Sequence, residues 1–252
     1  MGRGKIHQDE LKTISIHLWI KIQKIKTLTI MPQEQLLSSI VDYFQQEIFE
    51  PHLRNLQNDY ANFDSYSANP FLLPYLSKII EGEYSERGIA KALYLPRVLS
   101  SSITTAFGTH IKKILINNNL AESRSTNSNI ISFTDHISGL YTACILKAGP
   151  NTINSGDKSP IRSSLRSIEN VENKAIGIIY GAENELNGSY VNLQEEFDIF
   201  VGRQFWQRIT GYENFYINLS ERLRVLSENL DTNGRFDGGL NRLIRDIPGD
   251  IL

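Results

Sequence analysis

The stretch ISFTDHISGLYTACILKAGPNTIN, residues 131–154, decides the fold of this chain. Residues 130–137 and 140–147 read as two β-strands, and the Ser138-Gly139 pair between them is a turn signal, which predicts a β-hairpin. Farther along, AIGIIY at 175–180 and FDIFV at 197–201 are short apolar runs, typical of strands that are buried on both faces of a sheet. This part of the chain is therefore predicted to be mixed α/β.

Helical periodicity dominates the residues before the hairpin. Apolar side chains from Leu36 to Ile48 follow the i, i+3, i+4 spacing of a helix. Proline disrupts a helix interior, so Pro51 and Pro96 are expected to end the helices that precede them. Further helices are predicted, in chain order, over residues 71–80, 87–95, 97–116, 160–173, 204–209 and 213–230.

Length and pattern together indicate how the chain is divided. At 252 residues it is long enough to bury a large core as one domain. We expect residues 1–30 to be an N-terminal extension and residues 31–252 to be a single domain. Within that domain, 31–128 is predicted to be mainly helical, 129–230 an α/β core and 231–252 a loosely held tail.

Composition excludes several classes of protein. The hydrophobic fraction of 40% and the net charge of −2 do not fit a disordered protein. The single cysteine, Cys144, can form neither a disulfide framework nor a zinc site by itself, and its place in an apolar run predicts that it is buried. No apolar run is long enough to span a membrane as a helix. We therefore expect a cytoplasmic protein.

The small net charge conceals an uneven distribution along the chain. Between Arg87 and Lys174 there are eleven Lys and Arg residues against five Asp and Glu, whereas residues 175–252 hold seven against twelve. A cationic middle in a neutral protein suits an anionic partner that is approached on one face, such as a nucleic acid. Charge also fluctuates along any chain, so this signal alone is weak.

Two charged residues of the hairpin suggest a chemistry. Asp135 and Lys147 stand near the ends of the two predicted strands, and we expect their side chains to converge at the rim of the hairpin. A carboxylate that holds Mg²⁺, beside an ammonium that stabilises charge on phosphorus, is suited to phosphodiester hydrolysis. An ordinary surface strand with one acid and one base is the plainer interpretation, because that pattern is common.

Several segments in order make the nuclease interpretation stronger. LPRVLSSSITTAFGTHIKK (95–113), TDHISG (134–139), ILKAGPNTIN (145–154), AIGIIYG (175–181) and IFVGRQFWQRITG (199–211) together resemble type II restriction endonucleases that cut GGNCC-type sites, within the PD-(D/E)XK superfamily. The resemblance implies a central mixed β-sheet flanked by helices, with a helical N-terminal part. It also implies a homodimer, Mg²⁺ as cofactor and cleavage of double-stranded DNA at a short palindrome. A DNA methyltransferase is expected in the same system, although not as a stable partner.

The resemblance also assigns site residues. Asp135 matches the first acid of the motif and Lys147 its lysine, whereas Ile145 stands where the second acid is expected. A carboxylate from the following helix could replace it, so Glu169 or Glu172 is predicted, since an i, i+3 pair lies near one helix face. Asp157 is a weaker alternative. The main-chain carbonyl of Leu146 is a further candidate ligand, because Mg²⁺ prefers oxygen donors.

DNA contacts are expected from basic and amide side chains on both sides of the hairpin. Ile145 leaves a second function open, in which a protein of the same fold binds a DNA sequence but is catalytically impaired. A third hypothesis is a protein-interaction domain whose cationic middle is incidental. The predicted DNA-binding residues are Arg97, Lys112, Lys113, Asn151, Asn154, Arg162 and Arg166.

Overall fold

The computed structural model describes residues 31–124, 128–230 and 232–248, so the expected extension over residues 1–30 lies outside the described residues. The contacts divide the chain into two compact units. One, here called the sheet unit, comprises the residues up to 40 together with 111–222. The other, here called the helical unit, comprises 41–110 together with 223 onward. The contacts thus group the chain differently from the consecutive division expected from the sequence.

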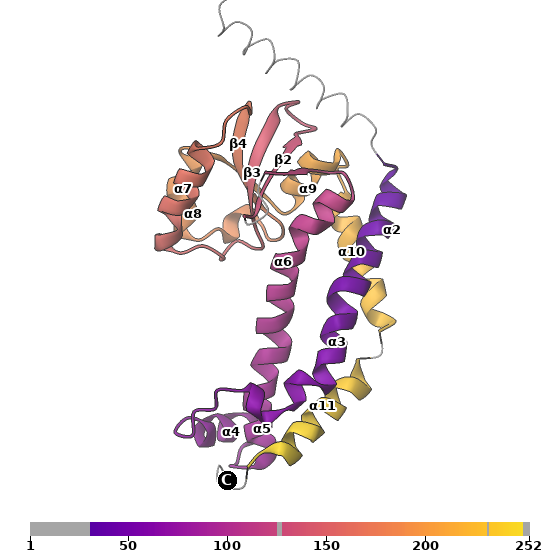
Figure 1. Cartoon of the computed structure of the whole chain (residues 1–252), viewed down its shortest axis with the longest axis vertical. Helices are drawn as coiled ribbons and strands as arrows, with labels where there is room; N and C mark the ends of the chain where they lie inside the picture. The colour runs from indigo at the N-terminus through magenta and orange to yellow at the C-terminus, as the bar shows by residue number, and fades with distance from the viewer. Residues whose placement is uncertain (1–30, 125–127, 231, 249–252) are drawn as a thin grey trace, which may run out of the picture. The chain divides into compact units, whose positions relative to one another are not determined.

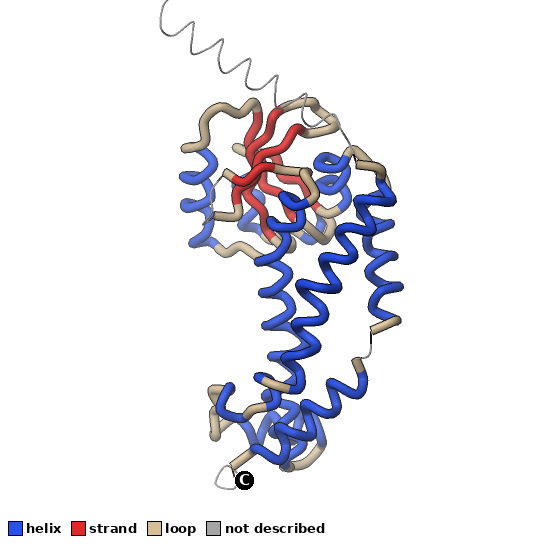
Figure 2. Tube along the Cα trace, turned by 45° about the vertical axis from the view of Figure 1, so that its right-hand side comes forward, coloured by secondary structure: helices blue, strands red, loops and turns tan. Residues whose placement is uncertain are grey.

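The sheet unit contains the predicted mixed sheet, which has five strands, one more than the sequence indicated (Figures 1 and 2). The two predicted hairpin strands pair antiparallel as β2 and β3, and Gly139 takes the positive φ of 73° that their turn requires. β3 and β4 pair parallel, as do β4 and β5. The strands, which lie in the sheet in chain order, are β1 Glu122–Ser123, β2 Ile130–Thr134, β3 Tyr141–Lys147, β4 Asn173–Ile178 and β5 Asp198–Val201.

Helices cover both faces of this sheet. On one face, Ile145 and Ile176 belong to an apolar cluster with α7 (Lys158–Arg166) and α8 (Gly188–Gln194). On the other face, Phe205 of α9 (Arg203–Thr210) lies against Cys144 and Gly177. Cys144 is fully buried there, as its apolar surroundings predicted. The predicted α/β fold, a central sheet flanked by helices, is therefore confirmed.

Neither Pro51 nor Pro96 ends its helix, so both of those predictions are wrong. The helix α2 (Gln33–Tyr43) continues through a π-type turn at Phe44–Phe49 into α3 (Glu50–Gln57), which holds Pro51 in its first turn. The helix α5 (Glu86–Pro96) continues through a second π-type turn, Arg97–Ser101, into α6 (Ser102–Asn117). A helix tolerates proline in its first turn, and a π-type turn beside a proline accommodates the change in hydrogen bonding.

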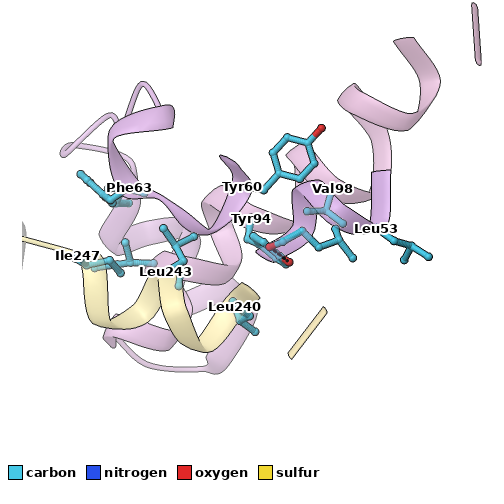
Figure 3. Packing of buried hydrophobic residues seen from close by; sticks show 12 residues of the cluster. Leu53, Tyr60, Phe63, Tyr94, Val98, Leu240, Leu243 and Ile247 are labelled. Atoms are coloured by element: carbon cyan, nitrogen blue, oxygen red, sulfur yellow. Dashed lines mark hydrogen bonds between the residues drawn. The ribbon is translucent and has the colours of Figure 1, made fainter. Parts of the chain in front are cut away.

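The helical unit buries its own apolar cluster (Figure 3). Leu53 of α3 and Tyr94 of α5 pack there with Leu240 and Leu243 of α11 (Asn233–Asp246). The cluster also holds Leu73 of α4 (Leu73–Glu81). The tail over 231–252 was expected to be loose, but its described part forms α11, because the apolar side chains of that helix are buried. Gly82, with φ of 80°, ends α4.

The apolar cluster of the helical unit also encloses a hydrogen bond. The Tyr94 hydroxyl donates to the main-chain carbonyl of Leu56 at 3.1 Å. Burial, helped by the carboxylate of Asp237, raises the pKa of Tyr94 to about 12, so the phenol stays protonated.

The remaining long helix, α10, covers Phe215–Glu228. Among the described residues, no helix combines the length and apolar character that crossing a membrane requires.

Candidate active site at the hairpin and the carboxyl edge of the sheet

The register of the hairpin separates Asp135 from Lys147. Thr134 pairs with Tyr141 and Ile130 with Ile145, so Asp135 follows the end of β2 that lies beside the start of β3. Lys147 stands at the other end of β3, six residues away, which corresponds to about 20 Å of strand. The alternation of side chains also places the two on opposite faces of the sheet.

The expected convergence of Asp135 and Lys147 is therefore wrong. In an antiparallel hairpin the end of the first strand lies beside the start of the second, so two strand ends that follow each other in the sequence are far apart in space. The predicted hairpin already implies this separation, because a turn as short as Ser138-Gly139 can join only an antiparallel pair of strands.

Asp135 is instead the centre of a buried polar cluster. Its side chain is fully buried. Oδ1 accepts from the main-chain N–H groups of Ile137 and Ser138 at 2.8 and 3.4 Å. Oδ2 accepts from the Ser138 hydroxyl at 2.8 Å and from Arg208 Nη1 at 2.5 Å. The carboxylate thus accepts four hydrogen bonds, and a buried charge requires such partners to compensate for the loss of water.

Arg208 ties this cluster to α9. Its guanidinium also lies 4.3 Å from the centre of the Phe200 ring, and its main-chain carbonyl accepts from the N–H of His136 at 2.9 Å. Burial lowers the pKa of His136, and the nearby Asp135 opposes that shift. The arrangement fastens the hairpin turn to α9. No local signal in the sequence indicates this role of Arg208, because no local spacing links two residues that are 73 positions apart.

The two glutamates expected on a helix lie outside it. The predicted helix over 160–173 ends at Arg166 as α7, and Asn170 has a positive φ of 60°, which a helix cannot accommodate. Glu172 Oε2 accepts from the main-chain N–H of Tyr141 at 2.8 Å, at the end of β3 opposite to Lys147. The expected helical i, i+3 pair is therefore wrong.

Glu169 does not lie beside the start of β3, where Glu172 lies. It lines an open pocket of about 380 Å³ together with Arg124, Ser128 and Ile130. Ile130 pairs with Ile145, which shares the Lys147 face of β3. Of the two glutamates, Glu169 is thus the one near the end of the hairpin at which Lys147 stands. Lys147 itself does not line the pocket. Asp157, the weaker alternative, caps a turn by accepting from the Asn154 N–H at 2.7 Å.

Lys147 stands where three parallel strands end. The sheet edge formed by the ends of β3, β4 and β5 is here called the Lys147 edge, and Ile178 and Val201 lie beside Lys147 on it. Lys147 is half-buried, and its carbonyl accepts from the Ile179 N–H at 3.1 Å. Sites in open α/β sheets commonly form at the carboxyl ends of the strands. The exposed Asn151 follows Lys147 on the loop that leaves this edge.

The structure divides the predicted DNA-binding residues into exposed and engaged groups. Lys113 and Asn151 are exposed, as is Arg97, whose guanidinium lies 5.5 Å from the Tyr60 ring centre in the helical unit. Lys112 is buried, and its ammonium donates to the carbonyl of Ser128 at 2.6 Å. The exposed Asn154 accepts from the Gly156 N–H at 2.8 Å and so caps the following turn.

Arg162 and Arg166 on α7 share one carboxylate. Both pair with Glu196, and Arg162 also donates to the Asn192 carbonyl at 3.1 Å. Hydrogen bonds from Arg166 and Arg162 lower the pKa of Glu196. One carboxylate offsets only one of the two positive charges, but both guanidiniums are bound to it, and each must leave Glu196 to contact a phosphate fully.

The predicted Mg²⁺ ligands do not fit a common site. The carboxylate of Asp135 is enclosed by four donors, Leu146 belongs to β3 beyond its reach, and Glu172 lies at the opposite end of that strand from Lys147. Within the ranges described, no group of three or more His, Cys, Asp or Glu side chains is placed to hold a metal ion.

A known protein family matches most of the chain. Residues 38–230 match the model of the family described as type II restriction endonuclease EcoO109I, which is well over half of the chain. The matched range includes the whole sheet, the Lys147 edge and helices α3 to α6. No curated protein matches the chain.

Proposed function

Since this chain belongs to the EcoO109I family of type II restriction endonucleases, we propose that it is a site-specific deoxyribonuclease. It acts as a homodimer on double-stranded DNA, cuts both strands at a short palindrome of the GGNCC type and depends on Mg²⁺. The observation that carries this proposal is the position of Lys147 at the carboxyl edge of the sheet, inside the range that matches the family.

In this proposal Lys147 is the catalytic residue. Its half-buried ammonium stabilises the negative charge that builds on the scissile phosphate, because a partly desolvated charge acts more strongly than one in water. Asn151 donates to the DNA from the adjoining loop, and Lys113 contacts the backbone. Glu169, on the same side of the hairpin, is the carboxylate assigned to the site. Asp135 holds the hairpin turn and does not touch the substrate.

Plasmid cleavage tests this function. The purified chain with Mg²⁺ is expected to produce discrete fragments, and Lys147→Ala is expected to slow cleavage by about 100-fold or more. Arg224→Ala is the matched control, because it also removes one positive charge but from an exposed i, i+4 pair with Glu228. Fragments formed equally well by the Lys147→Ala protein would contradict the proposal. Glu169→Gln tests the assigned carboxylate in the same assay.

A second function is favoured by two observations at the positions of the expected acids. Ile145, in the position where the family motif has an acid, belongs to the apolar cluster beneath α7 and α8, and Asp135 is enclosed by donors. A protein of this kind binds its DNA site without cutting it. It would show specific binding that weakens as salt rises and is unchanged by EDTA, with no fragments at any Mg²⁺ concentration.

The genomic neighbourhood separates the two functions further. A nuclease that cuts a palindrome requires that the host protect its own copies of the site. A DNA methyltransferase encoded beside this chain, with the same sequence specificity, is expected for the first function. A binding protein without nuclease activity has no such requirement.

A further inference from the structure

We propose that the phenol of Tyr180 is a further DNA-binding group of the Lys147 edge, where it donates a hydrogen bond to a backbone phosphate beside Lys147. The inference rests on the proposed function, whose site it extends by one side chain. Tyr180 follows β4 by two residues, at the edge where Lys147 ends β3. Its side chain is 43% exposed, and it is the one aromatic residue among the exposed large hydrophobic residues in the described part of the sheet unit.

The missing side chain of Gly149 makes room for this phenol. A Cβ added at Gly149 would lie 2.4 Å from both Cζ and Oη of Tyr180, which is too close for any real side chain. The hydroxyl end of the ring therefore lies directly against the main chain of Gly149, two residues beyond Lys147. Two residues span at most about 7 Å, so the ammonium and the phenol can reach one phosphate or two neighbouring phosphates.

The two loops that carry Gly149 and Tyr180 are fastened together. The main-chain N–H of Tyr180 donates to the carbonyl of Ala148 at 3.2 Å. The Gly149 carbonyl accepts from the hydroxyl of Thr152 at 2.7 Å and from that of Tyr190 at 3.4 Å. The phenol is thus held in position before DNA binds, and a group that is ordered in advance loses less conformational freedom on binding.

A phenol in this position suits a phosphate oxygen. Its hydroxyl is a neutral donor, and tyrosine is among the side chains that bind DNA phosphates. The ammonium of Lys147 is a point charge on a flexible stem, so it attracts a phosphate without fixing its orientation. The phenol of Tyr180 supplies that direction, and the contact positions the strand without reading the base sequence.

Packing alone is the alternative role of Tyr180. An aromatic ring can cover a glycine of a sheet, and in that role the ring matters whereas the hydroxyl does not. Tyr180→Phe keeps the ring and removes the donor, so this substitution separates the two roles.

Fluorescence anisotropy of a labelled duplex in EDTA measures DNA binding without cleavage. Tyr180→Phe should weaken binding about tenfold or more, equally for a duplex with a GGNCC site and for one without it, because a phosphate contact does not depend on sequence. Gly149→Ala should weaken it by the same factor, since the added methyl group takes the place of the phenol. Tyr84→Phe is the matched control, because Tyr84 is 44% exposed in the helical unit, and it should bind as the wild type does. Equal melting temperatures show that the variants are folded.

The salt dependence of binding distinguishes the phenol from a charged group. A neutral donor releases no counterion, so the slope of log K against log salt should be the same for Tyr180→Phe and the wild type, whereas Lys147→Ala should reduce its magnitude by about 0.9. A smaller slope for Tyr180→Phe would show that the substitution displaces Lys147, and this result would overturn the proposal. Unchanged affinity of Tyr180→Phe would also overturn it, as would a loss confined to the duplex with the site, which would place the phenol at a base.

Plasmid cleavage by the same proteins separates this inference from the proposed function. Tyr180→Phe should raise KM about tenfold and leave kcat unchanged, because the contact is the same in the bound substrate and in the transition state. Weaker DNA binding by Tyr180→Phe in a protein that cuts no plasmid supports the contact and contradicts the nuclease. Cleavage with equal KM for Tyr180→Phe and the wild type contradicts the contact and leaves the nuclease standing. A wild type without salt-dependent DNA binding overturns both.

Discussion

At the scale of single residues, the most informative side chain is Asp135. Taking a carboxylate out of water is costly, and Asp135 tolerates full burial because Arg208, Ser138 and two main-chain N–H groups surround it. Those same donors occupy the oxygens that a metal ion would need. The acid that looks catalytic from the motif is thus, by its contacts, a clamp between the hairpin turn and α9.

We therefore expect Asp135→Ala to affect stability. The substitution leaves Arg208 without its buried partner and should lower the free energy of unfolding by about 3 kcal/mol. Urea denaturation followed by circular dichroism measures the change, and the exposed Asp42→Ala is the control, expected to stay within about 0.5 kcal/mol of wild type. A urea denaturation curve of Asp135→Ala that overlays that of the wild type would show that these contacts of Asp135 do not stabilise the protein.

At the scale of elements, close packing of the sheet against α9 depends on a residue without a side chain. A Cβ added at Gly177 of β4 would lie 2.6 Å from the Phe205 ring and 2.8 Å from the Cys144 sulfur. Gly108, inside α6, has nothing within 4 Å of the same position. The two glycines therefore stand in opposite environments, one crowded and one open.

Substituting each glycine by alanine should move stability in opposite directions. Gly177→Ala is expected to destabilise the protein by about 1–3 kcal/mol, because Phe205 and Cys144 must shift within a packed core. Gly108→Ala should stabilise it by about 0.5–1 kcal/mol, because alanine loses less backbone freedom in a helix. Thermal melting of the two variants measures both effects, and equal shifts of the same sign would refute the packing argument.

At the scale of the whole molecule, the helical unit is built from two distant parts of the sequence. Tyr94 and Leu53 come from the first half of the chain, whereas Leu240 and Leu243 come from its last twenty residues (Figure 3). Neither part can bury these side chains by itself. The C-terminal residues are consequently part of the core of this unit.

Leu243→Ala tests that statement. Leu243 is fully buried, so the substitution removes apolar contacts, leaves a cavity and should cost about 2–5 kcal/mol. Val225→Ala, in the same unit but with a 44% exposed side chain, is the control and should change little. Chemical denaturation gives both values. A Leu243→Ala protein as stable as the control would mean that α11 is held only loosely after all.

The sequence by itself determined the elements and the family resemblance. Apolar period and turn residues predicted the hairpin, the two buried strands, most helices and the burial of Cys144, because these signals are local and each strand or helix must bury a contiguous apolar face. Tertiary structure alone decided which polar side chains meet. The antiparallel hairpin that the sequence predicts already separates Asp135 from Lys147, whereas the partner of Asp135 comes from a helix 73 residues away. Spacing along a chain does not encode such contacts, since they depend on how separate elements pack.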